Sequence, residues 1–213
     1  RQWMDAPGGL ITEDLKIKPV YDGLKELIKK RWWSNEEGRT NLSGCFASAV
    51  YCGNYDITVK KSNTTDNTLK KDDNGKYAEY VVDVSSEKGT PDVITLNDVL
   101  EAGKMSVDTS KFTYTITKNG QQVGGEYTAN VTASSNNDNN NHKYNLTATL
   151  PKLNAGESCQ IKYKYYYDTS LCDSGNESQA SNKVTGESIN KKSNEKVIDT
   201  SSSVIKYTRD DLD

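Results

Sequence analysis

The sequence of 213 residues contains few apolar side chains and almost no histidine. Only 33% of its residues are hydrophobic, and it has two Phe, two Met and a single His, His142. The low apolar content predicts either a core with extra stabilisation or long solvated segments. His142 lies in a run of Asn and Asp, where we expect a solvated loop. One such His leaves little room for a His-based triad or a multi-His metal site, so we expect no metal and no cofactor.

The sequence also lacks a basic surface and a long apolar run. Its net charge is −3 at pH 7, whereas a general nucleic-acid binder needs Lys and Arg for phosphate contacts. No apolar run approaches the roughly 20 residues that span a bilayer. We therefore expect neither nucleic-acid binding nor membrane insertion.

Four cysteines are present, and none of them forms a CxxC pair, which argues against a structural zinc site. They are Cys45, Cys52, Cys159 and Cys172. Two local disulfides are expected if the protein is exported, and four free thiols are the alternative.

Residues 1–52 differ from the rest of the chain. Pro19 is placed to open a helix that runs to about Trp33, with apolar residues at helical spacing. We expect three parts: residues 1–52 as an N-terminal segment with one helix, residues 53–190 as a β domain, and residues 191–213 as a linker with a terminal strand.

From Tyr55 onward, apolar and polar residues alternate, which is typical of half-buried strands. Turn signals separate these runs, and Asn119-Gly120 is the strongest hairpin signal among them. Seven or more short strands predict an immunoglobulin-like antiparallel β-sandwich, which makes the protein mainly β with a small helical segment.

Three polar residues occupy positions where this alternation calls for apolar ones. Lys61 continues the inward series of the first strand, Asp98 continues that of a central strand, and Asn182 shares its face with Val184 in a late strand. Burying any one of them alone costs several kcal/mol. An ordinary buried hydrogen-bond network or polar residues at a strand edge would also fit, and a one-residue slip would favour Lys60 over Lys61.

The same three side chains can react with one another. Burial removes the proton of a lysine and keeps that of an aspartate, so the amine becomes a nucleophile and the acid can polarise the Asn carboxamide. The amine would displace ammonia, with Asp98 as general acid and base. This reaction would happen once per molecule, so no turnover enzyme is expected. Asn176 is the rival to Asn182.

Five short motifs follow one another along the β domain: Ile94–Leu100, Val107–Ser110, Phe112–Thr117, Leu150–Ser158 with the strand that follows it, and Ser181–Val184. In this order and spacing they resemble the collagen-adhesin domains and related pilin modules of Gram-positive bacteria. In that family a lysine of the first strand and an Asn of the last strand form an isopeptide bond beside an acidic residue. The resemblance maps these roles onto Lys61, Asn182 and Asp98.

The resemblance implies a secreted module at the cell surface or cell wall, acting in adhesion or as part of a pilus. Its partners would be a host or partner-cell surface protein or glycan, or neighbouring modules of a larger surface protein. The segment Ser203–Tyr207 resembles the opening strand of a second pilin module, with Lys206 as that module's bonding lysine. A last strand of the present domain is the other interpretation. Tyr51-Cys52 superficially resembles the Cys motif of a thioester module, but no convincing partner Gln follows.

An extracellular carbohydrate-binding module is the alternative function. The tyrosines of residues 160–167 could form a stacking platform. The alternation instead places Tyr163, Tyr165 and Tyr167 inward, leaving only Tyr166 outside. A hydrolase is not favoured, because the sequence has no nucleophile motif.

Overall fold

The computed structural model describes Lys16, residues 19–26 and residues 54–209, and the chain divides after Asn54 into two units. In the first unit, helix α1 (Pro19–Glu26) begins at Pro19, as predicted, with Asp22 in its first turn and Lys25 in its last. The predicted continuation to Trp33 lies outside the described residues, as do Cys45 and Cys52. In the described part of the chain, no helix is long and apolar enough to cross a membrane.

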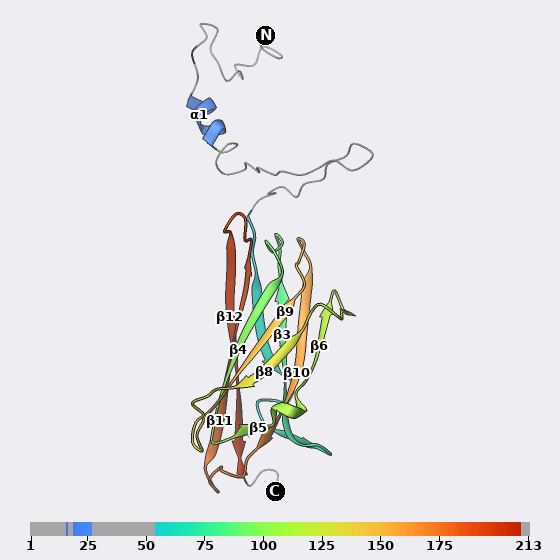
Figure 1. Cartoon of the computed structure of the whole chain (residues 1–213), viewed down its shortest axis with the longest axis vertical. Coiled ribbons are helices and arrows are strands. Elements are labelled where there is room, and N and C mark those ends of the chain that lie inside the picture. Colours follow the sequence, from blue (N-terminus) through green and yellow to red (C-terminus); the bar gives the residue numbers. More distant parts are fainter. Residues whose placement is uncertain (1–15, 17–18, 27–53, 210–213) are drawn as a thin grey trace. The chain divides into compact units, whose positions relative to one another are not determined.

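The second unit is built from strands, and the predicted immunoglobulin-like antiparallel β-sandwich is confirmed (Figure 1). The strands are β1 (Thr58–Asn63), β2 (Lys70–Asp72), β3 (Gly75–Ser85), β4 (Ile94–Gly103), β5 (Ser106–Val107), β6 (Thr113–Lys118), β7 (Gln121–Gln122), β8 (Ala129–Ala133), β9 (His142–Leu150), β10 (Ser158–Asp168), β11 (Glu177–Ile189) and β12 (Lys196–Thr208). The 3₁₀ turn Thr109–Lys111 precedes β6.

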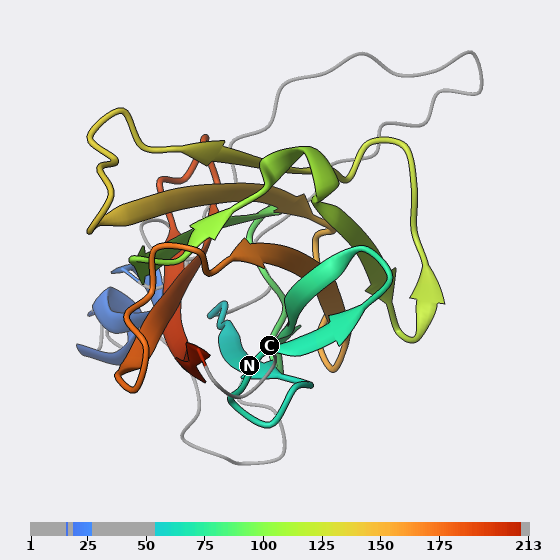
Figure 2. The same cartoon turned by 90° about the horizontal axis from the view of Figure 1, so that it is seen from below.

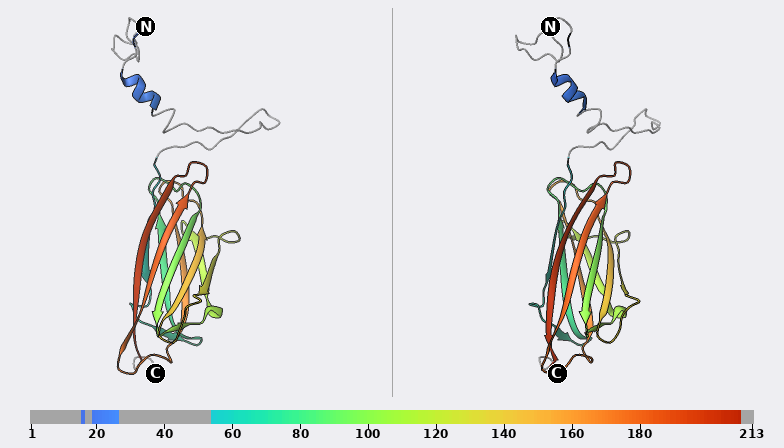
Figure 3. Two further views of the ribbon diagram at one scale, coloured as in Figure 1. Left: turned by 60° about the vertical axis from the view of Figure 1, so that its left-hand side comes forward. Right: turned by 90° about the vertical axis from the view of Figure 1, so that its left-hand side faces the viewer.

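Two antiparallel sheets lie face to face around the core (Figure 2). One sheet has the order β1-β3-β10-β6-β7, with β2 paired to β3 and β5 paired to β10. The other has the order β12-β11-β4-β9-β8. The long strands run along the length of the sandwich, as the side views in Figure 3 show.

Alternation along the strands builds the core, as the sequence pattern predicts. In β4 every second residue from Ile94 to Ala102 is buried, and in β10 the buried series runs through Ile161 and the following tyrosines. Asn119 and Gly120 both have positive φ, 49° and 78°, which is the geometry of a two-residue hairpin turn between β6 and β7. His142 opens strand β9 and is half-buried, so the expectation of a loop position for it is wrong.

The last strand is longer than predicted. β12 pairs with β11 over its whole length, from Lys196 to Thr208, and the chain bends between them at residues 190–195. The strand therefore belongs to the present sandwich, which is the second of the two interpretations of Ser203–Tyr207.

Cys159 and Cys172 are free and buried. Cys159 lies at the start of β10, and Cys172 follows the far end of that strand. An eleven-residue strand spans roughly 30 Å, whereas the Cα atoms of a disulfide lie within about 7 Å. A local disulfide between these two cysteines is therefore excluded. Burial also raises the pKa of the Cys159 thiol to about 12.

The edge strands β1 and β12 face each other across the two sheets. The N–H groups of Val59 and Lys61 donate to Asp199 Oδ2 (2.7 Å) and Ser201 Oγ (2.9 Å). The side-chain Nδ2 of Asn63 donates to Ser203 Oγ (2.9 Å). The residue numbers of the bonded partners increase in the same direction along both strands, so β1 and β12 run parallel. Side chains thus satisfy backbone donors that an open sheet edge would leave unpaired.

Candidate functional site

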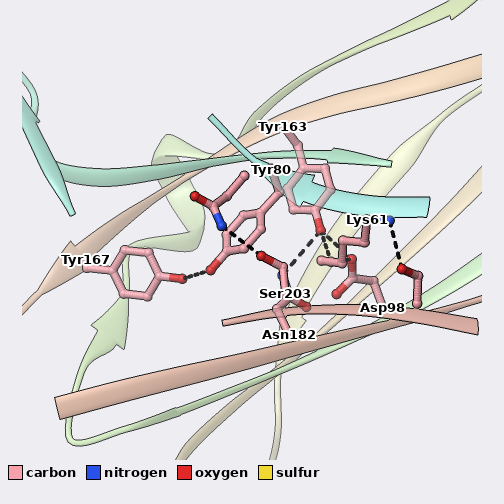
Figure 4. A network of polar contacts seen from close by, with 9 residues as sticks. Lys61, Tyr80, Asp98, Tyr163, Tyr167, Asn182 and Ser203 are labelled. Carbon is pink, nitrogen blue, oxygen red and sulfur yellow. Dashed lines mark hydrogen bonds and ion pairs between the residues drawn. The ribbon is translucent and has the colours of Figure 1, made fainter. Parts of the chain in front are cut away.

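Lys61, Asp98 and Asn182 come from three different strands and meet between the two sheets (Figure 4). Lys61 lies on β1 of the first sheet, while Asp98 and Asn182 lie on β4 and β11 of the second. The side chain of Lys61 has no exposed surface, and Asp98 and Asn182 are 1% and 0% exposed. Each occupies the inward position that its strand's alternation assigns to it.

Strand register brings Asp98 beside Asn182. In the pairing of β4 with β11, Asp98 lies opposite Val184, and Asn182 lies opposite Leu100. The two polar residues are therefore diagonal neighbours on one face of the sheet, a spacing at which side chains interact. Lys61 approaches them from the facing sheet.

A compact set of contacts joins the group. Lys61 Nζ forms an ion pair with Asp98 Oδ2 and donates to the Tyr163 hydroxyl at 2.5 Å. The Tyr163 hydroxyl donates to Asp98 Oδ2. Asn182 Nδ2 donates to the same phenol oxygen at 3.3 Å. The amine of Lys61 and the carboxamide of Asn182 are thus both within hydrogen-bonding reach of one oxygen atom.

Aromatic rings enclose the amine. Lys61 Nζ lies 5.1 Å from the ring centre of Tyr80 and 5.2 Å from that of Tyr163. These two rings stack with their centres 5.5 Å apart. The Tyr80 hydroxyl is hydrogen-bonded to that of Tyr167 (3.0 Å). The enclosure keeps water from the lysine, although the ring faces favour a cation.

Two oxygen atoms of the group have no hydrogen-bond donor among the described residues: Asp98 Oδ1 and Asn182 Oδ1. A buried acceptor without a donor costs about 1–3 kcal/mol. A proton on Asp98 would turn one of these two acceptors into a donor. The site is therefore short of hydrogen-bond donors while Asp98 is ionised.

Burial shifts the titration of both charged groups toward their neutral forms. Desolvation lowers the pKa of Lys61 from 10.5 to about 8, against the opposing effect of the nearby Asp98. Desolvation also raises the pKa of Asp98, against the opposing charge of Lys61. Desolvation raises the pKa of Tyr163 well above its ordinary value, so its phenol stays protonated. The environment thus favours a neutral amine next to a neutral acid.

The rival residues lie outside this group. Lys60 is exposed on the opposite face of β1, and Asn176 is exposed just before β11. Lys206 is exposed on β12 and pairs with Glu177 (3.0 Å). No cluster of three or more His, Cys, Asp or Glu that could hold a metal occurs in the described ranges.

The tyrosines of β10 do not form an exposed platform. Tyr163, Tyr165 and Tyr167 are buried, as the alternation predicts. Tyr166, predicted to be outside, is only 8% exposed and packs against Tyr77 with ring centres 5.9 Å apart. A sugar-stacking surface on this strand is therefore not supported.

Sequence reasoning missed the Tyr163 hydroxyl. Alternation correctly turned Tyr163 inward but gave no partner for its polar end. A buried Tyr usually finds one, so an inward Tyr near three inward polar residues was the available signal. The sequence interpretation also missed the contacts that the side chains of Asp199, Ser201 and Ser203 make with β1. The pattern that could have indicated them is a polar residue at every second position of the strand.

Comparisons with known proteins find related folds at low similarity. No family model matches the chain, and no curated protein matches its sequence. Among solved structures, AvmM, described as catalysing macrocyclization in alchivemycin A biosynthesis, has a TM-score of 0.44 and 10% identity, covering 72% of this chain and 89% of that one.

Two further matches are collagen-binding adhesin domains, the class that the sequence motifs resemble. The collagen-binding subdomain of the Enterococcus faecalis surface protein ACE has a TM-score of 0.40 and 10% identity, over 71% of this chain and 96% of that one. The collagen-binding domain of a Staphylococcus aureus adhesin has a TM-score of 0.32 and 17% identity, over 74% and 100%. At TM-scores and identities this low, the structural likeness carries no argument about function. The functional argument rests on the geometry of the Lys61, Asp98 and Asn182 site.

Proposed function

We propose that residues 54–209 form a structural module that locks itself with an isopeptide bond between Lys61 and Asn182. The observation that supports this most strongly is the burial of an amine, a carboxyl group and a carboxamide around one phenol oxygen, that of Tyr163, between the two sheets. A buried ion pair is a weak source of stability, because desolvation offsets the attraction between the charges. A chemical reaction that removes both charges explains the arrangement better.

The reaction balances within the site. In the reactive state the proton of the Lys61 ammonium group resides on Asp98, which leaves a neutral amine and a neutral acid. Nζ attacks Cγ of Asn182, and the carbonyl electrons move onto Oδ1. Collapse of this intermediate restores the carbonyl and breaks the Cγ–Nδ2 bond. Nδ2 gains one proton and leaves as ammonia, Nζ loses one, and Asp98 ends protonated as it began.

The bond would close residues 61–182 into a covalent loop. On the chain-entropy model such a loop removes about 5 kcal/mol of unfolded-state entropy. Unlike a disulfide, an amide bond also resists reduction. A chain with only 33% hydrophobic residues gains particular benefit from such a lock.

A locked sandwich of this kind suits a cell-surface adhesin or pilus-type protein of a Gram-positive bacterium, as the sequence motifs imply. In that setting its partners are host or partner-cell surface molecules, or neighbouring modules of the same protein. The module is not a turnover enzyme, because the reaction consumes its own side chains.

Intact-mass measurement tests the proposal. We expect the folded protein to weigh about 17 Da less than its sequence, which corresponds to one ammonia. Proteolysis should release a branched peptide that joins the segments containing Lys61 and Asn182. An unmodified mass in the folded protein would overturn the proposal.

The branched peptide and a set of variants separate this bond from other losses of ammonia. Asn119-Gly120 can lose the same mass by forming a succinimide, which leaves no branched peptide. Lys61→Ala and Asn182→Ala should each keep the full mass, and Lys60→Ala should lose ammonia like the unaltered chain. Asp98→Ala should fold without forming the bond.

A further inference from the structure

We propose that Tyr163 is a catalytic residue of the Lys61–Asn182 reaction, in which its hydroxyl carries the proton from Asp98 to the departing nitrogen. This inference rests on the proposed function and adds a fourth group to it. Its basis is that one phenol oxygen contacts Nζ of Lys61, Oδ2 of Asp98 and Nδ2 of Asn182.

The hydroxyl uses its whole hydrogen-bonding capacity on the reacting groups. A tyrosine hydroxyl has one donor and two acceptor positions. The donor goes to Asp98 Oδ2, and the acceptor positions take N–H groups of Lys61 (2.5 Å) and Asn182 (3.3 Å). Tyr163 itself is 1% exposed, so water does not compete for these positions.

Asp98 needs such an intermediary. Among the residues that the structure describes, Asp98 hydrogen-bonds to Lys61 and to Tyr163 but not to the Asn182 amide. The proton acquired by Asp98 must nevertheless reach Nδ2 for ammonia to leave. The Tyr163 oxygen is the atom that contacts both ends of this path.

The transfer balances through the phenol. Protonated Asp98 reverses its hydrogen bond and donates from Oδ2 to the Tyr163 oxygen. The phenol passes its own proton to Nδ2 as the Cγ–Nδ2 bond breaks. Asp98 then takes a proton from Nζ, so that tyrosine and aspartate both end in their starting forms. The phenol carries no net charge before or after the transfer.

Tyr163→Phe tests this role, because it removes the hydroxyl and keeps the ring packed against Tyr80. We expect bond formation to slow by roughly 10²-fold or more, the usual contribution of a positioned acid–base group. The rate is measured as the loss of about 17 Da after a short pulse of cell-free synthesis quenched in acid, in the full chain.

Tyr165→Phe is the matched control. Tyr165 lies two residues away on the same strand and face, is fully buried, and has a hydroxyl without a partner among the described residues. Its removal should leave the rate of bond formation unchanged. Equal slowing in both variants would mean that buried hydroxyls act only through packing, and would overturn the role of Tyr163.

A second measurement separates catalysis from folding. In an Asn182→Ala background, which cannot react, Tyr163→Phe should leave a cooperatively folded sandwich by denaturant titration. Loss of the fold there would assign the slow reaction to misfolding and overturn the proposal.

If the unaltered chain loses ammonia and Tyr163→Phe does so within threefold of its rate, the Tyr163 role fails alone. If the unaltered chain loses none, the cross-link itself fails.

Discussion

The ammonium group of Lys61 has no exposed surface, and its burial weakens the fold for as long as the group can carry a charge. The unfolded chain binds this proton with the ordinary pKa of 10.5, whereas the folded chain binds it with a pKa of about 8. Below pH 8 both states hold the proton, and the penalty is present in full. Between these two values only the unfolded state holds it, so stability rises with pH.

This linkage gives a prediction for the unreacted protein. In Asn182→Ala, the free energy of unfolding should rise by about 2 kcal/mol between pH 8 and pH 10, relative to Asn182→Ala with Lys61→Met. Denaturant titrations at a series of pH values measure the difference, and the paired variants cancel the other titrating groups. The cross-linked protein should show no such rise, because an amide nitrogen does not titrate. Parallel curves for the two variants would mean that Lys61 keeps an ordinary pKa.

The protonation of Asp98 changes stability with pH in the opposite direction, and it does so at acid pH. Its raised pKa means that the folded state holds the proton more tightly than the unfolded state does. The stability that this proton contributes is complete below the ordinary pKa of 3.8, and it is lost as pH rises through the raised value. In an unreacted variant, these two groups therefore contribute least to stability where Asp98 is ionised and Lys61 is still charged.

At the scale of the strands, Gly186 lets β1 approach β11 closely. Gly186 lies four residues after Asn182 on the same face of β11, and a Cβ there would lie 2.7 Å from Val59 Cγ2 and 3.1 Å from Leu96 Cδ2. Val59 is two residues before Lys61 on β1. The missing side chain thus helps to set the distance between the lysine strand and the asparagine strand.

Gly186→Ala should push β1 away from β11. We expect a loss of about 1–3 kcal/mol of stability in the Asn182→Ala background, and slower bond formation in the otherwise unaltered chain. Denaturant titration and time-resolved mass measurement follow the two effects. Gly124→Ala is the control, because nothing lies within 4 Å of its Cβ position. Equal effects of the two substitutions would show that close approach at Gly186 is unimportant.

The contacts between β12 and β1 make a second prediction at this scale. Asp199→Ala should leave the Val59 N–H without its acceptor, and Ser201→Ala should do the same for Lys61 N–H. Each should destabilise the Asn182→Ala background by about 1–3 kcal/mol in denaturant titration. Thr200→Ala, exposed on the other face of β12, should change stability little. If Asp199→Ala leaves the free energy of unfolding unchanged, water replaces the carboxylate at no cost.

The sequence predicted the strands and inward residues well because alternation reports which face of a strand a residue occupies. It selected Lys61 over Lys60 for that reason. Alternation does not report which residues of the facing sheet lie opposite, so Tyr163 was not linked to Asn182. It also missed the first half of β12, because a strand that covers an edge with Asp and Ser has no apolar series. Cysteine spacing alone left local disulfides and free thiols open, and the strand that separates Cys159 from Cys172 decides for free thiols at these two positions.

At the scale of the whole sandwich, the proposed covalent loop would not include all of the strands. Asn182 lies on β11, the penultimate strand, rather than on the last strand as the resemblance implied. Residues 183–209, with the second half of β11 and all of β12, follow the bond. Tension between the ends of the module would pass from Lys61 directly to Asn182 and bypass the residues between them.

The structure predicts how the module responds to pulling on Tyr55 and Arg209. β1 and β12 are parallel neighbours, and force at the start of one and the end of the other shears their contacts rather than opening them one at a time (Figure 1). Once these contacts break, the cross-linked protein should lengthen by only on the order of 100 Å, because residues 61–182 stay closed. Asn182→Ala should lengthen by on the order of 500 Å. Single-molecule force spectroscopy measures both lengths, and full extension of the unaltered chain would show that no covalent bond joins β1 to β11.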